Sequence, residues 1–125
     1  MQVHTLDHIA LVVDDLRRTC EFYERVLGMK AREERPGKWC LEFGASKISL
    51  HDPRHVPPDA AGTAPGTGVF CVLTDASVTD IVAHLKREGV EILTGPIKRV
   101  GGIGPMTSVY FKDPDGNLLE VSKPH

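Results

Sequence analysis

The chain has 125 residues, of which 41% are hydrophobic and 26% charged, with a formal net charge of −2. This length predicts a single domain that buries a core without disulfides or a structural metal. The weak negative charge and the lack of a basic stripe argue against a nucleic-acid partner. A membrane partner is not expected, because no run of 18 apolar residues and no secretory leader pattern is present.

Three scattered cysteines, Cys20, Cys40 and Cys71, form no CxxC pair and fall in apolar periodic segments. This pattern predicts reduced, buried thiols and a cytoplasmic protein.

The first half of the chain predicts a strand, a helix and three further strands. Asp14 or Asp15 caps the helix, whose apolar spacing ends at Gly28. The expected ranges are a strand over 6–13, a helix over 16–27, a strand over 29–34 and a hairpin of 38–43 and 47–51. A segment rich in proline and glycine, residues 53–68, then reads as a linker.

The second half repeats this order, with Asp75 and Gly89 each 61 residues after Asp14 and Gly28. Its expected elements are a strand over 69–74, a helix capped by Asp75 or Ser77, a loop over 95–106 and strands over 108–111 and 118–122. An internal repeat of one βαβββ unit follows. The predicted fold is α+β, with two paired βαβββ modules (1–52 and 69–125) forming a curved mixed sheet around one cavity.

The glycines at 101, 102 and 104 invite comparison with a phosphate-binding loop, but no Lys-Ser/Thr and no helix follow them. We expect this loop to be a flexible flap over the cavity.

The stretch FKDPDGNLLEV, residues 111–121, predicts a turn at Asp113-Pro114-Asp115-Gly116 and a return strand. Alternation places Leu119 and Val121 on one face and Glu120 on the other. Taken alone, Glu120 either faces water at an edge or points into a cavity. The repeat matches it to Ser49, and His51 and His8 lie on strands of the first module. These three side chains, His8, His51 and Glu120, could therefore converge on one cavity.

Three segments carry a resemblance to a known family: LDHIALVVDDL, FYERVLGM and VYFKDPDGNLLEVS. Together they resemble the vicinal oxygen chelate superfamily, which includes glyoxalase I, extradiol dioxygenases, fosfomycin-resistance enzymes and bleomycin-binding proteins. KISLHDP and GPIKRVGGIGPMTSVYFKDPDGNLLEVS are most similar to its glyoxalase-domain, virulence-associated subgroup.

The resemblance implies one divalent metal, Zn, Ni, Mn or Fe, in the cavity. His8 and Glu120 match ligand positions of the family, whereas Val69 stands where many relatives carry a further histidine. His51 could supply the missing ligand, since two imidazoles and a carboxylate leave open coordination positions. Ser108 and Tyr110 fall where fosfomycin-resistance enzymes carry polar cavity residues, which makes them candidate substrate contacts.

The resulting hypothesis is a metal-dependent, glyoxalase-like lyase or isomerase acting on a small oxygen-chelating substrate, such as a thiol adduct. Glu120 is the candidate base and Tyr110 the candidate acid. One alternative is an extradiol-type dioxygenase, and another is a metal-free ligand-sequestering protein of the bleomycin-resistance type. Family members of this kind often form homodimers, which we expect here too.

Overall fold

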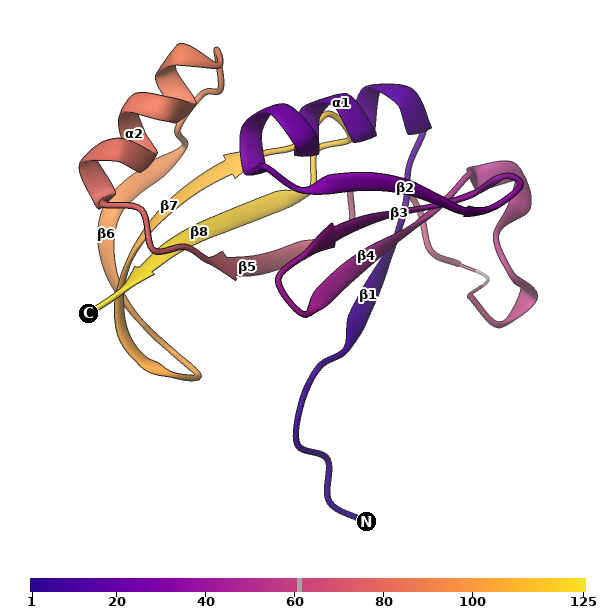
Figure 1. Cartoon of the computed structure of the whole chain (residues 1–125), viewed down its shortest axis with the longest axis horizontal. Helices are drawn as coiled ribbons and strands as arrows, with labels where there is room; N and C mark the ends of the chain where they lie inside the picture. Colours follow the sequence, from indigo (N-terminus) through magenta and orange to yellow (C-terminus); the bar gives the residue numbers. More distant parts are fainter. Residues whose placement is uncertain (61) are drawn as a thin grey trace. The chain divides into compact units, whose positions relative to one another are not determined.

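The computed structural model of the protein describes residues 1–60 and 62–125. It divides into two compact units, Met1–Gly66 and Thr67–His125 (Figure 1). The sheet of the first unit has the strand order β1-β4-β3-β2, and that of the second has the order β5-β8-β7-β6. The α+β class and the internal repeat are therefore confirmed. One residue of the predicted linker, residue 61, lies outside the described residues.

The first unit follows the expected order closely. Its elements are β1 (His8–Val12), α1 (Leu16–Leu27), β2 (Lys30–Arg35), β3 (Lys38–Phe43), β4 (Ser46–His51) and the short 3-10 helices η1 (Pro53–His55) and η2 (Pro58–Ala60). Helix α1 begins at Asp15, whose side chain accepts a hydrogen bond from the Arg18 N–H at 3.1 Å. It ends at Gly28, which adopts φ +64°, a conformation that glycine reaches without strain.

The core of the first unit lies between α1 and one face of its sheet. Tyr23 on the helix, and Leu41 and Ile48 on the strands, are fully buried. Leu41 and Ile48 are register partners in β3 and β4, so their side chains point to the same face. Burial of this apolar face stabilises the unit and leaves the opposite face of the sheet to polar residues.

The second unit contains β5 (Val69–Leu73), α2 (Val78–Arg87), β6 (Thr94–Gly101), β7 (Gly104–Lys112) and β8 (Leu118–Pro124). Ser77 caps α2 by accepting a hydrogen bond from the Asp80 N–H at 3.1 Å. Phe111 and Leu119 are fully buried and Val121 nearly so. The prediction that Leu119 and Val121 share the core face is thus confirmed.

The expected loop over 95–106 is wrong, because this stretch is a β-hairpin. Strand β6 is the edge strand of its sheet and pairs antiparallel with β7, with Gly101 opposite Gly104 around the turn. An edge strand tolerates Pro96 because one side of it donates no ladder hydrogen bonds. Gly104, at φ +111°, supplies the positive φ that a tight hairpin needs. The glycines and prolines of this stretch therefore serve an edge strand and a tight turn, although they are equally typical of a loop.

The turn between β7 and β8 is built around Asp113 and Asn117, as the sequence pattern predicts. The Asp113 carboxylate accepts hydrogen bonds from the N–H groups of Asp115 and Asn117, at 3.0 and 2.9 Å. Gly116 adopts φ +91°. Asn117 is 1% exposed, and its Oδ1 accepts a hydrogen bond from the Gly68 N–H at 2.7 Å. The turn therefore also fixes the start of β5.

A membrane-spanning helix needs about 20 consecutive apolar residues, and the helices here are compared with that length among residues 1–60 and 62–125 only. None of them is long and apolar enough to cross a membrane.

Candidate functional site

The polar face of the first sheet carries His8. This residue lies in β1 opposite Lys47 of β4, and its side chain is 50% exposed. Its Nδ1 lies 2.7 Å from Oδ2 of Asp7. A carboxylate at Nδ1 favours the tautomer that carries its proton there, which leaves the Nε2 lone pair available to a metal ion. The Asp7–His8 pair thus has the chemistry of an oriented metal ligand.

His51 lies on the same face, at the opposite end of the strands. It is half-buried in β4 opposite Val12, and its backbone oxygen accepts a hydrogen bond from the Val13 N–H at 2.9 Å. Desolvation, and secondarily the positive charge of Lys38, lower the pKa of His51. A lowered pKa favours the neutral imidazole, which is the form that binds metals.

The two histidines share a face but do not meet in the first unit. His8 precedes Val12, the register partner of His51, by four residues. At about 3.3 Å per residue, this separation corresponds to roughly 13 Å along the strands. A single ion would hold both only if the two imidazoles leaned towards each other.

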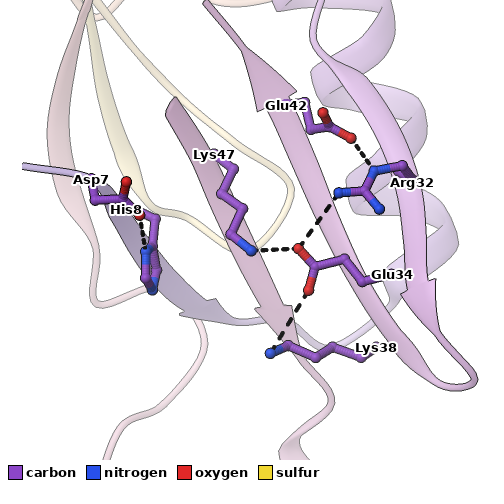
Figure 2. Close-up of polar contacts among 7 residues, drawn as sticks. All are labelled: Asp7, His8, Arg32, Glu34, Lys38, Glu42 and Lys47. Atoms are coloured by element: carbon purple, nitrogen blue, oxygen red, sulfur yellow. Dashed lines mark hydrogen bonds and ion pairs between the residues drawn. The ribbon is translucent and has the colours of Figure 1, made fainter. Parts of the chain in front are cut away.

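A network of ion pairs lies on the same face (Figure 2). Glu34 is 16% exposed, and its carboxylate lies 2.5 Å from Lys47 Nζ, 3.8 Å from Lys38 Nζ and 3.9 Å from an Arg32 nitrogen. The Arg32 guanidinium also pairs with Glu42. The Lys47 hydrogen bond, followed by one from Cys40, lowers the pKa of Glu34 to about 2. Three cations thus surround two carboxylates on the face that carries His8.

Two pockets of the first unit lie near these groups. One, of about 340 Å³, borders the His8 face and is lined by Asp7, Arg32, Glu42 and the 44–47 segment. The other, of about 830 Å³, lies between α1 and the sheet, with Trp39 in its wall. Trp39 pairs with the buried Leu50, so the larger pocket opens on the face opposite His8.

In the second unit, the three predicted residues Ser108, Tyr110 and Glu120 share one face. Tyr110 is the register partner of Glu120, and Ser108 is the partner of Ser122. The hydroxyls of Ser108 and Ser122 lie 2.7 Å apart, and Ser122 Oγ donates a hydrogen bond to Glu120 Oε1 at 3.3 Å. Both serines are fully buried. They therefore form a fixed polar floor beside the Glu120 carboxylate.

Arg99 of β6 orients the Tyr110 hydroxyl. The Arg99 Nε–H donates to Tyr110 Oη at 3.2 Å, and the guanidinium carbon lies 5.6 Å from the ring centroid. Because the phenol oxygen accepts this hydrogen bond, its own proton remains available to donate to another group. This geometry suits the role of a general acid.

The sequence reasoning missed three residues of this face: Ser122, Arg99 and Cys71. Alternation from Glu120 points to Ser122, and alternation from Val69 points to Cys71. No such signal existed for Arg99, because its segment was read as a loop. Cys71 also corrects the expectation of buried thiols, since Cys40 is buried but Cys71 is exposed. Its strand places it on the polar face and not in the core.

The predicted metal ligands draw on both units. Among residues 1–60 and 62–125, no group of three His, Cys, Asp or Glu side chains is placed to hold a metal ion. The individual donors nevertheless fit such an ion, because His8 has an oriented imidazole, His51 favours the neutral form and Glu120 is held by a serine hydroxyl. The triad of His8, His51 and Glu120 stays a prediction.

Comparison with known proteins identifies relatives over almost the whole chain. Virulence protein STM3117 of Salmonella typhimurium is 38% identical over 124 residues, spanning 98% of this chain and 86% of that protein. Its crystal structure matches with a TM-score of 0.96 over the full length of both chains. A glyoxalase domain-containing protein, RDO1 of Mycosarcoma maydis, is 38% identical over 98% of this chain and 69% of its own length.

A more distant relative is the metallothiol transferase FosB of Staphylococcus epidermidis, 26% identical over 97% of this chain and 82% of that protein. The family model of the Glyoxalase/Bleomycin resistance protein/Dioxygenase superfamily matches residues 5–121. Together with the strand order and helix positions of both units, these matches establish that the chain belongs to the Glyoxalase/Bleomycin resistance protein/Dioxygenase superfamily.

Proposed function

We propose that the chain is a divalent-metal-dependent, glyoxalase-like enzyme that acts on a small substrate with two neighbouring oxygens. The observation that carries this proposal is the contact between Asp7 and His8, at 2.7 Å, which leaves Nε2 of His8 ready to bind a metal. The name of the 26% identical relative, metallothiol transferase, supports metal and thiol chemistry within the superfamily.

His8 and Glu120 would hold the ion, and His51 would join them if its imidazole leaned along the strands towards His8. When bound, such an ion supplies Lewis-acid stabilisation of a developing oxyanion or enolate. Tyr110 is suited to donate a proton to the substrate, since Arg99 occupies its hydroxyl oxygen at 3.2 Å. Ser108 is suited to hold a substrate oxygen, and Glu120 is the candidate base. A lyase or isomerase reaction on a thiol adduct fits these roles.

A second function, metal-free sequestration of a ligand, is favoured by one observation. Val69, where many relatives carry a histidine, is 75% exposed and offers no ligand atom. Such a protein would need the polar face but no ion.

Metal content separates the two functions. Protein purified without a histidine tag is analysed by elemental mass spectrometry as wild type, His8→Ala, His51→Ala and Glu120→Ala, with His55→Ala as an exposed control. We expect near-stoichiometric metal in the wild type and the control, and loss of metal in the other three variants. Thiol adducts and catechols are then screened as substrates. Conversion of a thiol adduct would support the lyase or isomerase, and cleavage of a catechol would support the dioxygenase. A wild type without metal, even after reconstitution, would refute the enzyme and favour sequestration.

The expected homodimer has its own measurement, which is the molar mass in solution by light scattering. A mass near twice 13.7 kDa supports the dimer, and a monomer refutes it.

A further inference from the structure

Helix α1 has a second face besides the one that packs in the core of the first unit. Its core face consists of the buried residues Thr19, Phe22, Tyr23 and Val26. The pocket of about 830 Å³ lies beside the helix, on the side of the edge strand β2. Six helix residues line it, at positions 16, 17, 20, 21, 24 and 25, and they form the α1 stripe. Residues spaced four apart in this way share one side of a helix and can pack together against a partner.

The apolar part of the pocket lining is only half-buried. Leu16 and Cys20 of the helix, and Ala31 and Trp39 of the sheet, are neither buried in the core nor fully exposed. Trp39 supplies the largest apolar side chain among them, and tryptophan is enriched where two protein surfaces meet. These residues therefore offer apolar area that a partner could cover.

Two charged residues of the α1 stripe have no partner in the part of the chain that the structure describes. Arg17 and Glu24 are exposed, and neither makes an ion pair or a side-chain hydrogen bond there. The other two charges, Glu21 and Arg25, pair with each other at 2.6 Å. Arg17 and Glu24 are seven residues apart, which places them on the same side of the helix and about 10 Å apart along its axis. One end of the stripe is thus positive and the other negative.

A second copy of the same stripe matches these charges. When two α1 helices pack antiparallel across a two-fold axis, Arg17 of each copy faces Glu24 of the other, because a two-fold interface repeats every contact. The midpoint between the two residues, and hence the axis, lies at Cys20 and Glu21. The net charge of −2 opposes this approach only weakly. A small ligand would instead need an apolar body with opposite charges two helical turns apart.

We propose that the α1 stripe, together with Ala31 and Trp39, is the interface of a homodimer in which the two α1 helices lie antiparallel. The apolar residues supply the area that is removed from water. The two pairs of Arg17 with Glu24 set the register and the antiparallel direction. This inference rests on the homodimer proposed above, for which it names the surface, and it is independent of the metal-dependent function.

Charge reversal tests the proposed register. Molar mass is measured by light scattering over a dilution series of the full chain as wild type, Arg17→Glu, Glu24→Arg and the double variant with both changes. We expect each single variant to raise the dimer dissociation constant more than about tenfold, because like charges then face each other twice. The double variant exchanges the signs and restores both pairs, so its dissociation constant should lie within about threefold of the wild-type value. Arg18→Glu, the same change in charge outside the stripe, is the matched control.

Trp39 reports on the same surface directly, because it is the only tryptophan of the chain. On dilution of the wild type, we expect its fluorescence emission to shift to longer wavelength over the concentrations at which the molar mass halves. In Arg17→Glu, the emission should have the longer wavelength already at concentrations where the wild type is dimeric. An emission that stays constant while the wild-type mass halves would refute an interface at Trp39.

The remaining outcomes are distinct. A wild type that is monomeric at every concentration refutes the interface and the homodimer together, while the metal-dependent function stands. If the wild type is a dimer that Arg17→Glu weakens no more than Arg18→Glu does, or if the double variant does not restore it, the homodimer stands and this interface is overturned. Circular dichroism checks that each variant is folded, and Glu24→Arg makes the same test from the other end of the helix if Arg17→Glu is unfolded.

Discussion

Replacing Asn117 by alanine tests how much the Asn117 side chain stabilises the start of β5 and the turn before β8. The side chain is 1% exposed and makes two hydrogen bonds, both of 2.7 Å: Oδ1 accepts from the Gly68 N–H, and Nδ2 donates to Asp113 Oδ2. Gly68 precedes the strand that carries Cys71, and Asn117 precedes the strand that carries Glu120. The variant therefore removes the side-chain link between the two strands at their start and keeps the backbone hydrogen bond from the Leu118 N–H to the Gly68 oxygen, at 3.0 Å.

The magnitude follows from the groups left behind. A part-buried N–H at Gly68 and one oxygen of the buried Asp113 each lose a partner. Leaving the Gly68 N–H unsatisfied costs about 1–3 kcal/mol, and losing one hydrogen bond to Asp113 costs about 1 kcal/mol, so the free energy of unfolding should fall by about 2–4 kcal/mol. At about 4 °C per kcal/mol for a domain of this size, the melting temperature should fall by about 8–16 °C.

Urea denaturation followed by circular dichroism, together with scanning calorimetry, measures both quantities. Lys112→Ala is the matched control, because Lys112 is an exposed residue at the end of β7 beside the same turn. A loss below about 0.5 kcal/mol in Asn117→Ala, or one equal to that of the control, would refute the reasoning, since changes of that size are ordinary for surface sites. We also expect weaker metal binding in Asn117→Ala than in the control.

Three further predictions concern single residues. The folded-state pKa of Glu34 is lowered from 4.5 to about 2, so its carboxylate stabilises the fold above pH 4.5 and this contribution is lost as the pH falls towards 2. Glu34→Gln should therefore have a lower free energy of unfolding than the wild type at neutral pH. In urea titrations, this difference should shrink between pH 4.5 and pH 2. Gly95→Ala should lower the free energy of unfolding by about 1–3 kcal/mol in the same assay, because Gly95 has φ +109° and an added Cβ would lie 2.4 Å from a backbone oxygen of β7. Gly102→Ala is the control and should leave the stability nearly unchanged, because an added Cβ there meets no atom within 4 Å. Asp15→Ala removes the cap of α1 and should lower the free energy of unfolding by about 1 kcal/mol. Asp59→Ala, at an exposed position, should leave it unchanged. Equal values for the two variants would contradict the capping role.

Most of the fold could be predicted because its signals are local. Asp15 and Gly28 bound the first helix where capping chemistry places them, and the DPDG turn forms where Gly116 supplies the positive φ. The hairpin of β6 and β7 could not, because glycine and proline mark both loops and edge strands. The pairing of Gly101 with Gly104 distinguishes the hairpin from a loop, and this pairing is visible only in the folded structure.

The faces of the candidate site could be predicted, but their contacts could not. Alternation places Ser108 and Tyr110 on one face of β7, and the register of β7 and β8 brings Glu120 to the same face. Alternation does not say how far apart two residues on a face lie, so it gave no sign that His8 and His51 occupy opposite ends of their strands. Register depends on pairing between strands, which a single strand pattern does not encode.

The two units distribute ligand chemistry in a complementary way. Equivalent positions of the repeat carry His8 and Val69 on the first strand, and Ser49 and Glu120 on the last. The first unit thus keeps a histidine but lacks the carboxylate, and the second keeps the carboxylate but lacks the histidine. The proposed metal ligands accordingly take their histidines from the first unit and their carboxylate from the second. The difference in donor side chains therefore comes from divergence between the repeats at these strand positions and not from the fold that they share.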